Sequence, residues 1–364
     1  MTNPISGTTT RKGKKMSCIK TLATVIERPN EAAFREITLC PRQEDSVICK
    51  TRLSAISTGT DMKTYHGFQH PEQCWYPLVP GYENVGTVIE EGSYAPDFKK
   101  GDRVMINECR RYGDVCAAWG GGTLICQKDS ASCNDSFDMM CKIPDNVTDE
   151  QAVLAYLACV PCKGIERFNL KDGDTIMVFG AGMVGISAMQ ILKIKCPTAT
   201  VIAVEPHPYR QEIAKFYADY VITPDEAGMK KFMEITNGRK ADKIIECSGN
   251  PAVPGILWQY IKDGGWQDGD VDEPGHIHLQ GDYPDKLIFD HYHHWFTKNV
   301  NISMTCALKW HCKPQILQWI SEGKFDTSHL PYEIWEAGKA KEAFEYQHKK
   351  GMECFKILFD WRSL

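Results

Sequence analysis

Features typical of secreted, membrane-bound and nucleic-acid-binding proteins are missing from this sequence of 364 residues. No uninterrupted apolar run approaches the roughly 18 residues needed to cross a bilayer. The N-terminus has no apolar core of the kind that signal peptides carry. The formal net charge of −5 gives no reason to expect a nucleic acid or an anionic membrane as a partner. We therefore expect a cytoplasmic protein that acts on a small molecule.

Acidic residues are missing from the opening stretch "MTNPISGTTTRKGKKMS", which is polar and basic. This composition predicts a disordered tail over residues 1–16, with an organelle-targeting peptide as the alternative. The rest of the chain has no repeats. With 43% hydrophobic residues it can bury a large core, which favours two domains.

The 16 cysteines lack the spacing of a compact zinc cluster. Cys159 and Cys162 form a CxxC in an apolar stretch without a second pair nearby, which favours small core side chains. Four more cysteines are spaced too loosely for a zinc knot, and three neighbouring histidines are interpreted as surface or substrate-pocket residues. These are Cys109, Cys116, Cys126 and Cys133, and His291, His293 and His294.

The secondary-structure pattern changes after residue 149. Before it, short runs such as "VICKTRLSAIST", "NVGTVIEEG" and "GDRVMI" predict strands of a small barrel or sandwich. After it, helical patterns alternate with apolar strands such as "DTIMVFG", "ATVIAVE" and "DKIIECSG". Such alternation is typical of βαβ units in a parallel sheet. The fold class expected is therefore α/β, with a separate β-rich domain.

The stretch "VFGAGMVG" carries glycines at 180, 182 and 185 between a predicted strand and a predicted helix. Gly180 allows a tight turn, Gly182 allows a pyrophosphate to approach the backbone, and Gly185 allows close helix packing. The amide groups of Met183 and Val184 open the helix and favour phosphate binding. A dinucleotide cofactor is therefore expected, and a methyltransferase is the rival interpretation.

The second strand of this unit ends at Glu205, 25 positions after Gly180. An acid there accepts hydrogen bonds from a ribose and repels a 2′-phosphate, so NAD is expected rather than NADP. Arg210 lies five residues further on and weakens this exclusion.

Several motifs in order resemble the medium-chain dehydrogenase/reductase (alcohol dehydrogenase) superfamily, from "STGTDMKTYHG" and "PLVPGYENVGTVIEEG" to "VFGAGMVG" and "ECFKILFDW". "ISTGTD", "YPLVPGYE" and "KILFDW" resemble the bacteriochlorophyllide dehydrogenase branch most. The resemblance implies a GroES-like β-barrel domain over 17–155 and 307–364, and a doubly wound Rossmann domain over 156–306. It also implies that the cofactor lies in the cleft between the domains, and that homodimers or homotetramers form through the Rossmann sheets.

Zinc-bearing members of this superfamily place their metal ligands at positions that here hold Thr58, Tyr82 and about Ala155. None of these supplies a thiolate, an imidazole or a carboxylate, so no zinc is expected there. The segment between "GDRV" and "GGGT" is also too short for the family's four-cysteine lobe.

Hydroxyl groups then have to handle the substrate oxygen. Tyr82 is expected to donate to that oxygen or to pass a proton, with a nearby cation such as Lys63 lowering its pKa. Thr60 matches the family's proton-relay position and Thr58 can assist it. Lys63 falls where many relatives place the outer relay histidine, and His66 is close enough in sequence to substitute.

Two further residues are expected to bind the cofactor, and a third is expected to organise a loop. Lys356 matches a basic residue that reaches the cofactor pyrophosphate in relatives, and Ser248 follows a Rossmann strand near the cofactor. The alternatives are a solvated lysine and a simple turn cap. Asp61 is expected to organise its loop through backbone hydrogen bonds.

The main hypothesis is a zinc-independent, NAD-linked oxidoreductase that moves a hydride between nicotinamide and a secondary alcohol or ketone, in a specialised biosynthetic pathway. A non-catalytic dinucleotide-binding sensor of the same fold is the alternative. The sequence identifies neither the substrate nor the direction of the reaction.

Overall fold

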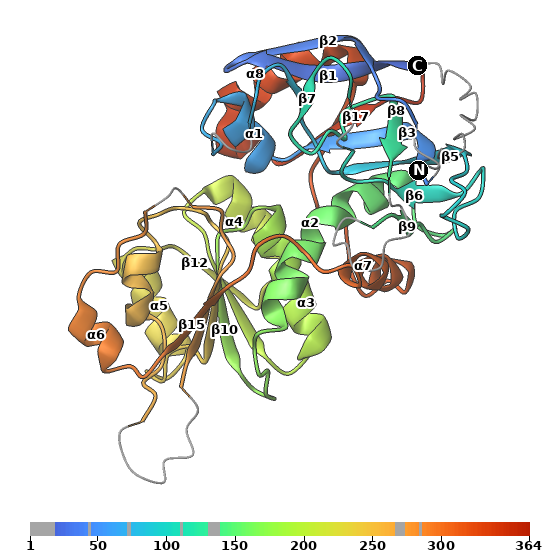
Figure 1. Cartoon of the computed structure of the whole chain (residues 1–364). Helices are drawn as coiled ribbons and strands as arrows, with labels where there is room; N and C mark the ends of the chain where they lie inside the picture. Colours follow the sequence, from blue (N-terminus) through green and yellow to red (C-terminus); the bar gives the residue numbers. More distant parts are fainter. Residues whose placement is uncertain are drawn as a thin grey trace, which may run out of the picture.

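The structure is a computed structural model that describes residues 19–42, 45–70, 74–109, 112–129, 139–265, 274–283 and 286–364. The segment 1–16 and Cys133 lie outside these residues. Figure 1 shows two bodies, with helix α2 (Asp149–Ile165) between them. Within the described residues, every helix is too short or too polar to span a bilayer.

The first body is the β-rich domain, for which the resemblance implies a GroES-like fold, and it is built from two sheets. The smaller has the order β2-β1-β4-β7: β1 (Lys20–Arg28), β2 (Glu31–Thr38), β4 (Leu78–Val79) and β7 (Cys116–Ala117). The larger has the order β16-β17-β3-β5-β6-β9, with β8 beside β3. Its strands are β3 (Val47–Ile56), β5 (Asn84–Glu90), β6 (Arg103–Met105), β8 (Ile125–Lys128), β9 (Cys141–Lys142), β16 (Glu333–Glu336) and β17 (Ile357–Asp360).

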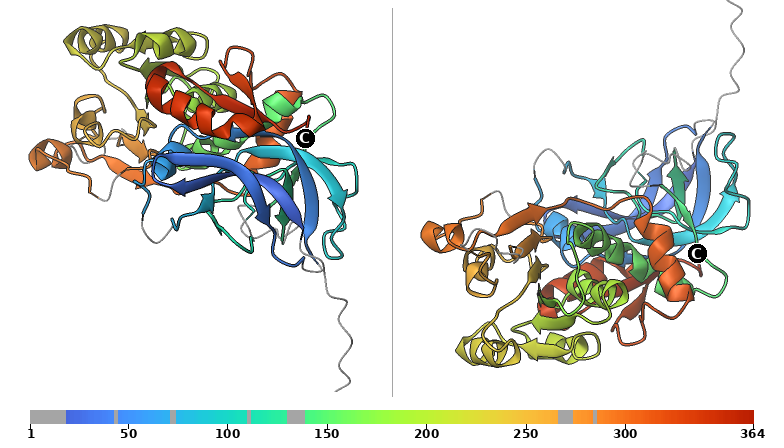
Figure 2. Two further views of the ribbon diagram at one scale, coloured as in Figure 1. Left: turned by 90° about the horizontal axis from the view of Figure 1, so that it is seen from above. Right: turned by 90° about the horizontal axis from the view of Figure 1, so that it is seen from below.

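The last two strands of the larger sheet come from the C-terminal part of the chain, which therefore returns to the first body after building the second. Strand β17 pairs with β3, and the C-terminus lies in the first body in both views of Figure 2. Further helical elements outside the Rossmann sheet are α1 (Thr60–Tyr65), α7 (Cys312–Ser321), η3 (Ala337–Lys339), α8 (Ala340–Lys350) and η4 (Gly351–Glu353).

The second body is the Rossmann domain. Its six strands are all parallel, in the order β12-β11-β10-β13-β14-β15. The strands are β10 (Thr175–Phe179), β11 (Thr200–Val204), β12 (Tyr220–Ile222), β13 (Lys243–Glu246), β14 (His276–Leu279) and β15 (Asn301–Met304). The helical elements are α3 (Met183–Lys195), α4 (Pro208–Ala214), α5 (Glu226–Ile235), η2 (Pro254–Gln259) and α6 (Tyr292–Phe296).

The strand and helix alternation predicted from the sequence is confirmed. Central strands such as β10 and β13 are buried along nearly their whole length, as expected for strands covered on both faces. Parallel neighbours need a crossover, and the helices supply it.

Helix α2 joins the two bodies. It begins with a capping box, in which Thr148 and Gln151 exchange hydrogen bonds of 2.9 and 3.2 Å. One continuous hydrophobic cluster runs from Leu53 in the first body through Ala158 of α2 to Ile186 in the second. The predicted domain boundaries at 155/156 and 306/307 stay predictions; the first falls inside α2.

Candidate functional site

The glycine loop lies between β10 and α3, and two of its glycines have no room for a side chain. A Cβ on Gly185 would come within 1.9 Å of the carbonyl oxygen of Gly180. Gly180 has a φ of +88°, and its Cβ would meet the backbone of Ser248 at 2.9 Å. Only glycine fits at these two positions, so Gly180 and Gly185 allow the chain to make this tight turn between β10 and α3.

The third glycine faces open space instead. A Cβ on Gly182 would have only Nη1 of Arg210 nearby, at 3.6 Å. Helix α3 starts after Gly182 without a side-chain cap, which leaves the amide groups of its first turn, including Met183 and Val184, available to a ligand. A guanidinium beside an uncapped helix N-terminus fits the phosphates of a dinucleotide.

Glu205 braces this loop. Its carboxylate accepts the amide of Ala181 at 2.8 Å and that of His207 at 2.8 Å, and the side chain is almost wholly buried. A carboxylate has about four lone-pair sites, so it retains acceptor capacity for a ribose hydroxyl. The preference for NAD over NADP stays a prediction.

A buried acid that the sequence analysis missed lies behind the loop. Glu246, at the end of β13, accepts the amide of Ser248 at 2.8 Å and also the hydroxyls of Ser248 and Tyr283. Burial raises the pKa of Glu246, and these donors oppose that rise. Ser248 thus lies beside the glycine loop with its hydroxyl turned to Glu246.

Three hydroxyl groups meet in the first body. The Tyr82 hydroxyl donates to Oγ of Ser57 at 2.7 Å and lies 3.1 Å from Oγ1 of Thr60. The ring of Tyr82 packs between Trp119 and Tyr156, with centroids 5.6 and 5.0 Å away. We call Ser57, Thr60 and Tyr82 the hydroxyl cluster. Sequence analysis found two of its members and missed Ser57, whose only signal was its place beside the "TGTD" turn.

The prediction that Lys63 lowers the pKa of Tyr82 is wrong. Burial raises this pKa above its usual range, and the nearby carboxylates of Glu83 and Asp61 raise it further. Lys63 instead pairs with Asp282 of the second body, at 3.1 Å. Tyr82 therefore stays protonated at neutral pH and acts as a hydrogen-bond donor. His66 is also turned elsewhere, to Oδ1 of Asn30 at 2.7 Å.

Asp61 organises the turn, as predicted. It accepts the amides of Ser57 at 2.9 Å and Gly81 at 3.0 Å. Burial raises the pKa of Asp61 to about 7, against the opposing effect of these amides.

Lys356 lies in the core of the first body. Its ammonium contacts Oε1 of Glu83 at 2.5 Å, and the two side chains are 1% and 0% exposed. Contact between Lys356 and a cofactor pyrophosphate stays a prediction, because in this structure the ammonium binds Glu83.

The positions that the resemblance assigns to zinc ligands hold a half-buried Thr58, the phenol of Tyr82 and the buried methyl group of Ala155. This set does not fit zinc, since it offers no thiolate, imidazole or carboxylate. The neighbouring acids, Asp61 and Glu83, are held by backbone amides and by a lysine. In the part of the chain that the structure describes, the side chains grouped closely enough to bind a metal are elsewhere, at Cys162, Glu166 and Cys312.

The three adjacent histidines are exposed on α6 and its N-terminal cap, as the sequence suggested. The ring of His294 stacks on Trp258 at 4.2 Å. Figure 2 shows α6 at the outer end of the second body in both views.

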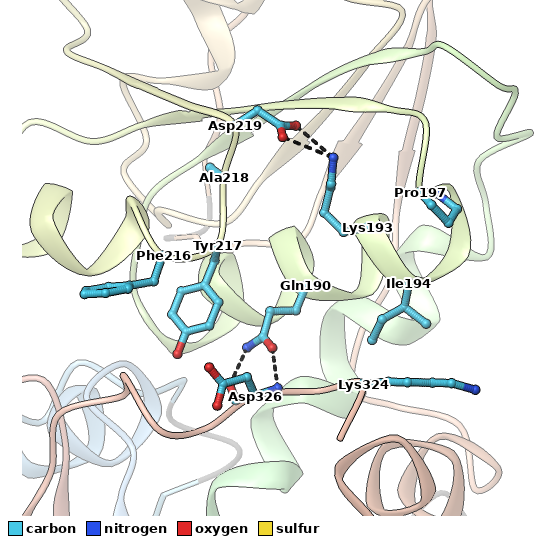
Figure 3. A pocket seen from close by; sticks show the side chains of 10 residues that line it. All are labelled: Gln190, Lys193, Ile194, Pro197, Phe216, Tyr217, Ala218, Asp219, Lys324 and Asp326. Carbon is cyan, nitrogen blue, oxygen red and sulfur yellow. Dashed lines mark hydrogen bonds and ion pairs between the residues drawn. The ribbon is translucent and has the colours of Figure 1, made fainter. Parts of the chain in front are cut away.

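A cavity of about 580 Å³ lies on the Rossmann domain, away from the residues described so far (Figure 3). Two of its charged groups pair with each other: Lys193 contacts Asp219 at 3.0 Å. Gln190 exchanges hydrogen bonds of 3.0 and 2.7 Å with the backbone of Asp326. Neither the glycine loop nor the hydroxyl cluster contributes to its lining, so this cavity is not the reaction site.

Residues 43–146 match the family model of the alcohol dehydrogenase GroES-like domain, and residues 183–265 match that of the zinc-binding dehydrogenases. The chain belongs to the medium-chain alcohol dehydrogenase superfamily. D-arabinitol dehydrogenase 1 of Uromyces fabae is 24% identical over 352 residues, covering 92% of this chain and 95% of that protein. Sorbitol dehydrogenase of Bacillus subtilis is 24% identical over 352 residues, covering 92% of this chain and 96% of that protein.

The fold agrees with solved structures of this superfamily. A protein of Escherichia coli that bears the name short chain alcohol dehydrogenase, solved with NADH, superposes with a TM-score of 0.76 at 20% identity, covering 94% of this chain and 99% of that one. This medium-chain dehydrogenase is thus an enzyme of the alcohol dehydrogenase/reductase type.

Proposed function

We propose that this dehydrogenase moves a hydride between NAD(P), with NAD preferred, and a secondary alcohol or ketone, without zinc in the cleft. The observation that supports this most is the hydroxyl cluster. Tyr82 stands at a position where the resemblance expects a zinc ligand, and its hydroxyl is bonded to Ser57 and lies beside Thr60. The residue at this position can be a metal ligand or this hydrogen-bonded phenol, but not both. In either case its task is to help hold the oxygen of the substrate.

The cofactor, when bound, supplies or accepts the hydride. The chain must then hold the substrate oxygen and move one proton. Because the pKa of Tyr82 is raised by burial, its phenol serves as a donor to a developing alkoxide rather than as a base. Ser57 and Thr60 each carry a hydroxyl that donates and accepts, so they can exchange the proton with Tyr82. Thr58 and Lys63 are proposed to assist at the outer end of this path.

Replacing Tyr82 with phenylalanine tests the proposal, since it removes only the hydroxyl. We expect kcat to fall about 10²- to 10³-fold, the effect of losing one preorganised donor, with NADH affinity unchanged. Tyr94→Phe, at an exposed tyrosine, is the matched control and should keep full activity. An unchanged kcat in Tyr82→Phe contradicts the proposed role.

The substrate screen follows from the relatives and the resemblance. It should include polyols of the arabinitol and sorbitol type and a tetrapyrrole alcohol of the bacteriochlorophyllide type, each with NAD and NADP. We propose a specialised biosynthetic step in the cytoplasm; turnover of simple central polyols alone, with a high kcat/KM, contradicts that assignment.

A non-catalytic sensor is the second candidate, because the chain lacks thiolate, imidazole and carboxylate donors at all three zinc-ligand positions. Tight NADH binding, measured by nicotinamide fluorescence, without turnover of any compound in the screen favours this candidate. Turnover that is lost in Tyr82→Phe excludes it.

We also propose a homodimer or homotetramer joined through the Rossmann sheets. Strand β15 lies at the edge of its sheet, and Ile302 and Met304 on it are exposed. A pair of edge strands can join two sheets. Light scattering on Ile302→Lys should show a smaller species than the unmodified protein; a wild-type monomer contradicts the proposal.

A further inference from the structure

A group of potential metal ligands lies at the junction of α2 and α7, apart from the hydroxyl cluster and the glycine loop. Cys162 and Glu166 are four residues apart at the end of α2, which puts them on one face of the helix. Cys312 is the first residue of α7. The two sulfur atoms and a carboxylate oxygen of Glu166 all lie within 4.8 Å of one another.

We propose that Cys162, Glu166 and Cys312 form a binding site for zinc or a similar thiophilic divalent cation. Two thiolates and a carboxylate are a donor set that zinc uses in proteins, with bonds of about 2.0 to 2.3 Å. Tetrahedral donors at such bond lengths stand about 3.3 to 3.8 Å apart, so only small side-chain shifts are needed to close the group around an ion.

The residues around Glu166 hold it in position. Nζ of Lys309 contacts Oε2 at 2.6 Å, and Nε2 of His311 lies 2.7 Å from Oε1. Groups that bind a ligating carboxylate in this way orient it and tune the metal. His311 also carries the nearest imidazole to the carboxylate and can supply the fourth donor by a rotation of its side chain.

The charges are compatible with a bound cation. Two thiolates and one carboxylate carry one negative charge more than a divalent ion neutralises, and the ammonium group of Lys309 offsets it. Without the ion, Lys309 and His311 both contact the carboxylate of Glu166. The thiol of Cys162 then donates to Oε1 of Gln315 at 3.5 Å, a contact that a metal would replace.

An ion has a path to the site. Both cysteines are fully buried, whereas the side chains of Glu166 and His311 are 21% and 35% exposed and form its outer wall. A bound ion would fasten the end of α2 to the chain that returns from β15. These are the two places where the chain passes between the bodies, so the metal would limit their relative motion. The inference does not depend on the proposed function.

Cobalt titration of the reduced, metal-free protein tests the site directly. We expect one equivalent of Co²⁺ to bind and to give thiolate-to-cobalt charge-transfer bands in the near ultraviolet, which zinc then removes. Cys162→Ser and Cys312→Ser should abolish the bands. His311→Ala should weaken binding about 10- to 100-fold.

Cys159→Ser is the matched control, because Cys159 shares the CxxC and the helix but donates to the carbonyl of Ala155 at 3.4 Å. It should keep the bands. Alkylation of the unmodified protein gives a second measurement that does not depend on a variant folding. Zinc should protect the Cys162 and Cys312 peptides from iodoacetamide under mild denaturant and leave the exposed Cys306 reactive.

The proposal is overturned if the reduced protein gives no charge-transfer band, if the bands survive in both cysteine variants, or if zinc fails to protect the two peptides. Each readout is taken without substrate or cofactor. A failure of the metal site therefore leaves the proposed hydride transfer untouched, and the reverse also holds.

Discussion

Removing the ammonium group of Lys356 should destabilise the protein strongly. Nζ of Lys356 is 2.5 Å from Oε1 of Glu83, and the two side chains are 1% and 0% exposed. The other carboxylate oxygen, Oε2, has no hydrogen-bond partner among the described residues. Lys356→Met would leave a buried carboxylate without its counter-charge, which costs about 3–5 kcal/mol. Urea unfolding at neutral pH measures this loss.

The double variant Glu83→Leu/Lys356→Met supplies the control. Replacing both charges by apolar side chains of similar size is often neutral or stabilising, so the double variant should be more stable than Lys356→Met alone. Together with the single variant Glu83→Leu, the set gives a coupling energy of several kcal/mol, on the order of the Lys356→Met loss. If Lys356→Met costs less than about 1 kcal/mol, or if the two changes add, the pair does not stabilise the core in the way proposed.

The stability loss of Lys356→Met should also change with pH, and the direction of that change is an independent test. Burial already raises the pKa of Glu83, and Lys356 holds it down. Without Lys356 the folded-state pKa rises further above its unfolded value of about 4.3. A group with a raised folded pKa loses its stabilising contribution as the pH rises, so the deficit of this variant should be larger at pH 8 than at pH 5. A deficit that is constant with pH contradicts this.

Three further predictions concern single residues. Gly185→Ala should destabilise the protein and abolish NADH binding, since its Cβ would meet the Gly180 carbonyl oxygen at 1.9 Å. Gly182→Ala should leave the free energy of unfolding unchanged and only weaken NADH binding, as measured by fluorescence titration. In wild type, the buried Asp61, with a pKa raised to about 7, should make stability fall by about 3 kcal/mol as the pH rises from 4 to 7; Asp61→Asn should flatten this part of the urea-unfolding profile, and an equally steep profile contradicts the assignment. Lys63→Met should change the unfolding free energy by less than about 1 kcal/mol, because its partner Asp282 is 62% exposed, and a larger loss contradicts a solvated pair.

The elements were predictable where periodicity is strong. Apolar runs between turn residues identified strands such as β3 and β10, and the glycine spacing identified the turn before α3. The residues at which helices end were less predictable from the sequence. The pattern "PYRQEIAKFYA" extends to residue 218, yet α4 ends at Ala214, and the amides of Phe216 and Tyr217 then bond to carbonyls three residues back instead of four.

The candidate site was predictable only in part, because its decisive contacts join distant residues. Nothing local distinguishes Ser57 from the other hydroxyl residues of its turn; the contact with Tyr82, 25 positions away, does. The Lys356–Glu83 pair spans 273 positions and leaves no pattern in the sequence. Lys63 is close to the site along the chain, but burial and two carboxylates decide the pKa of Tyr82.

A zinc measurement on this protein needs variants to be interpreted. If Cys162, Glu166 and Cys312 bind zinc, the purified protein contains metal although the mechanism proposed for the hydroxyl cluster does not use it. Loss of the metal in Cys312→Ser with activity retained would assign the ion to the junction of α2 and α7 and leave the cleft metal-free.

The position of β17 also orders events during synthesis. Strand β17 (Ile357–Asp360) pairs with both β16 and β3, so it lies in the interior of the larger sheet. The first strand of that sheet along the chain, β3, begins at Val47. All the strands of the Rossmann sheet, ending with Met304, leave the ribosome earlier. The second body can therefore fold while the first still exposes an open strand edge, and during that interval the nascent chain is most vulnerable to aggregation and most dependent on chaperones.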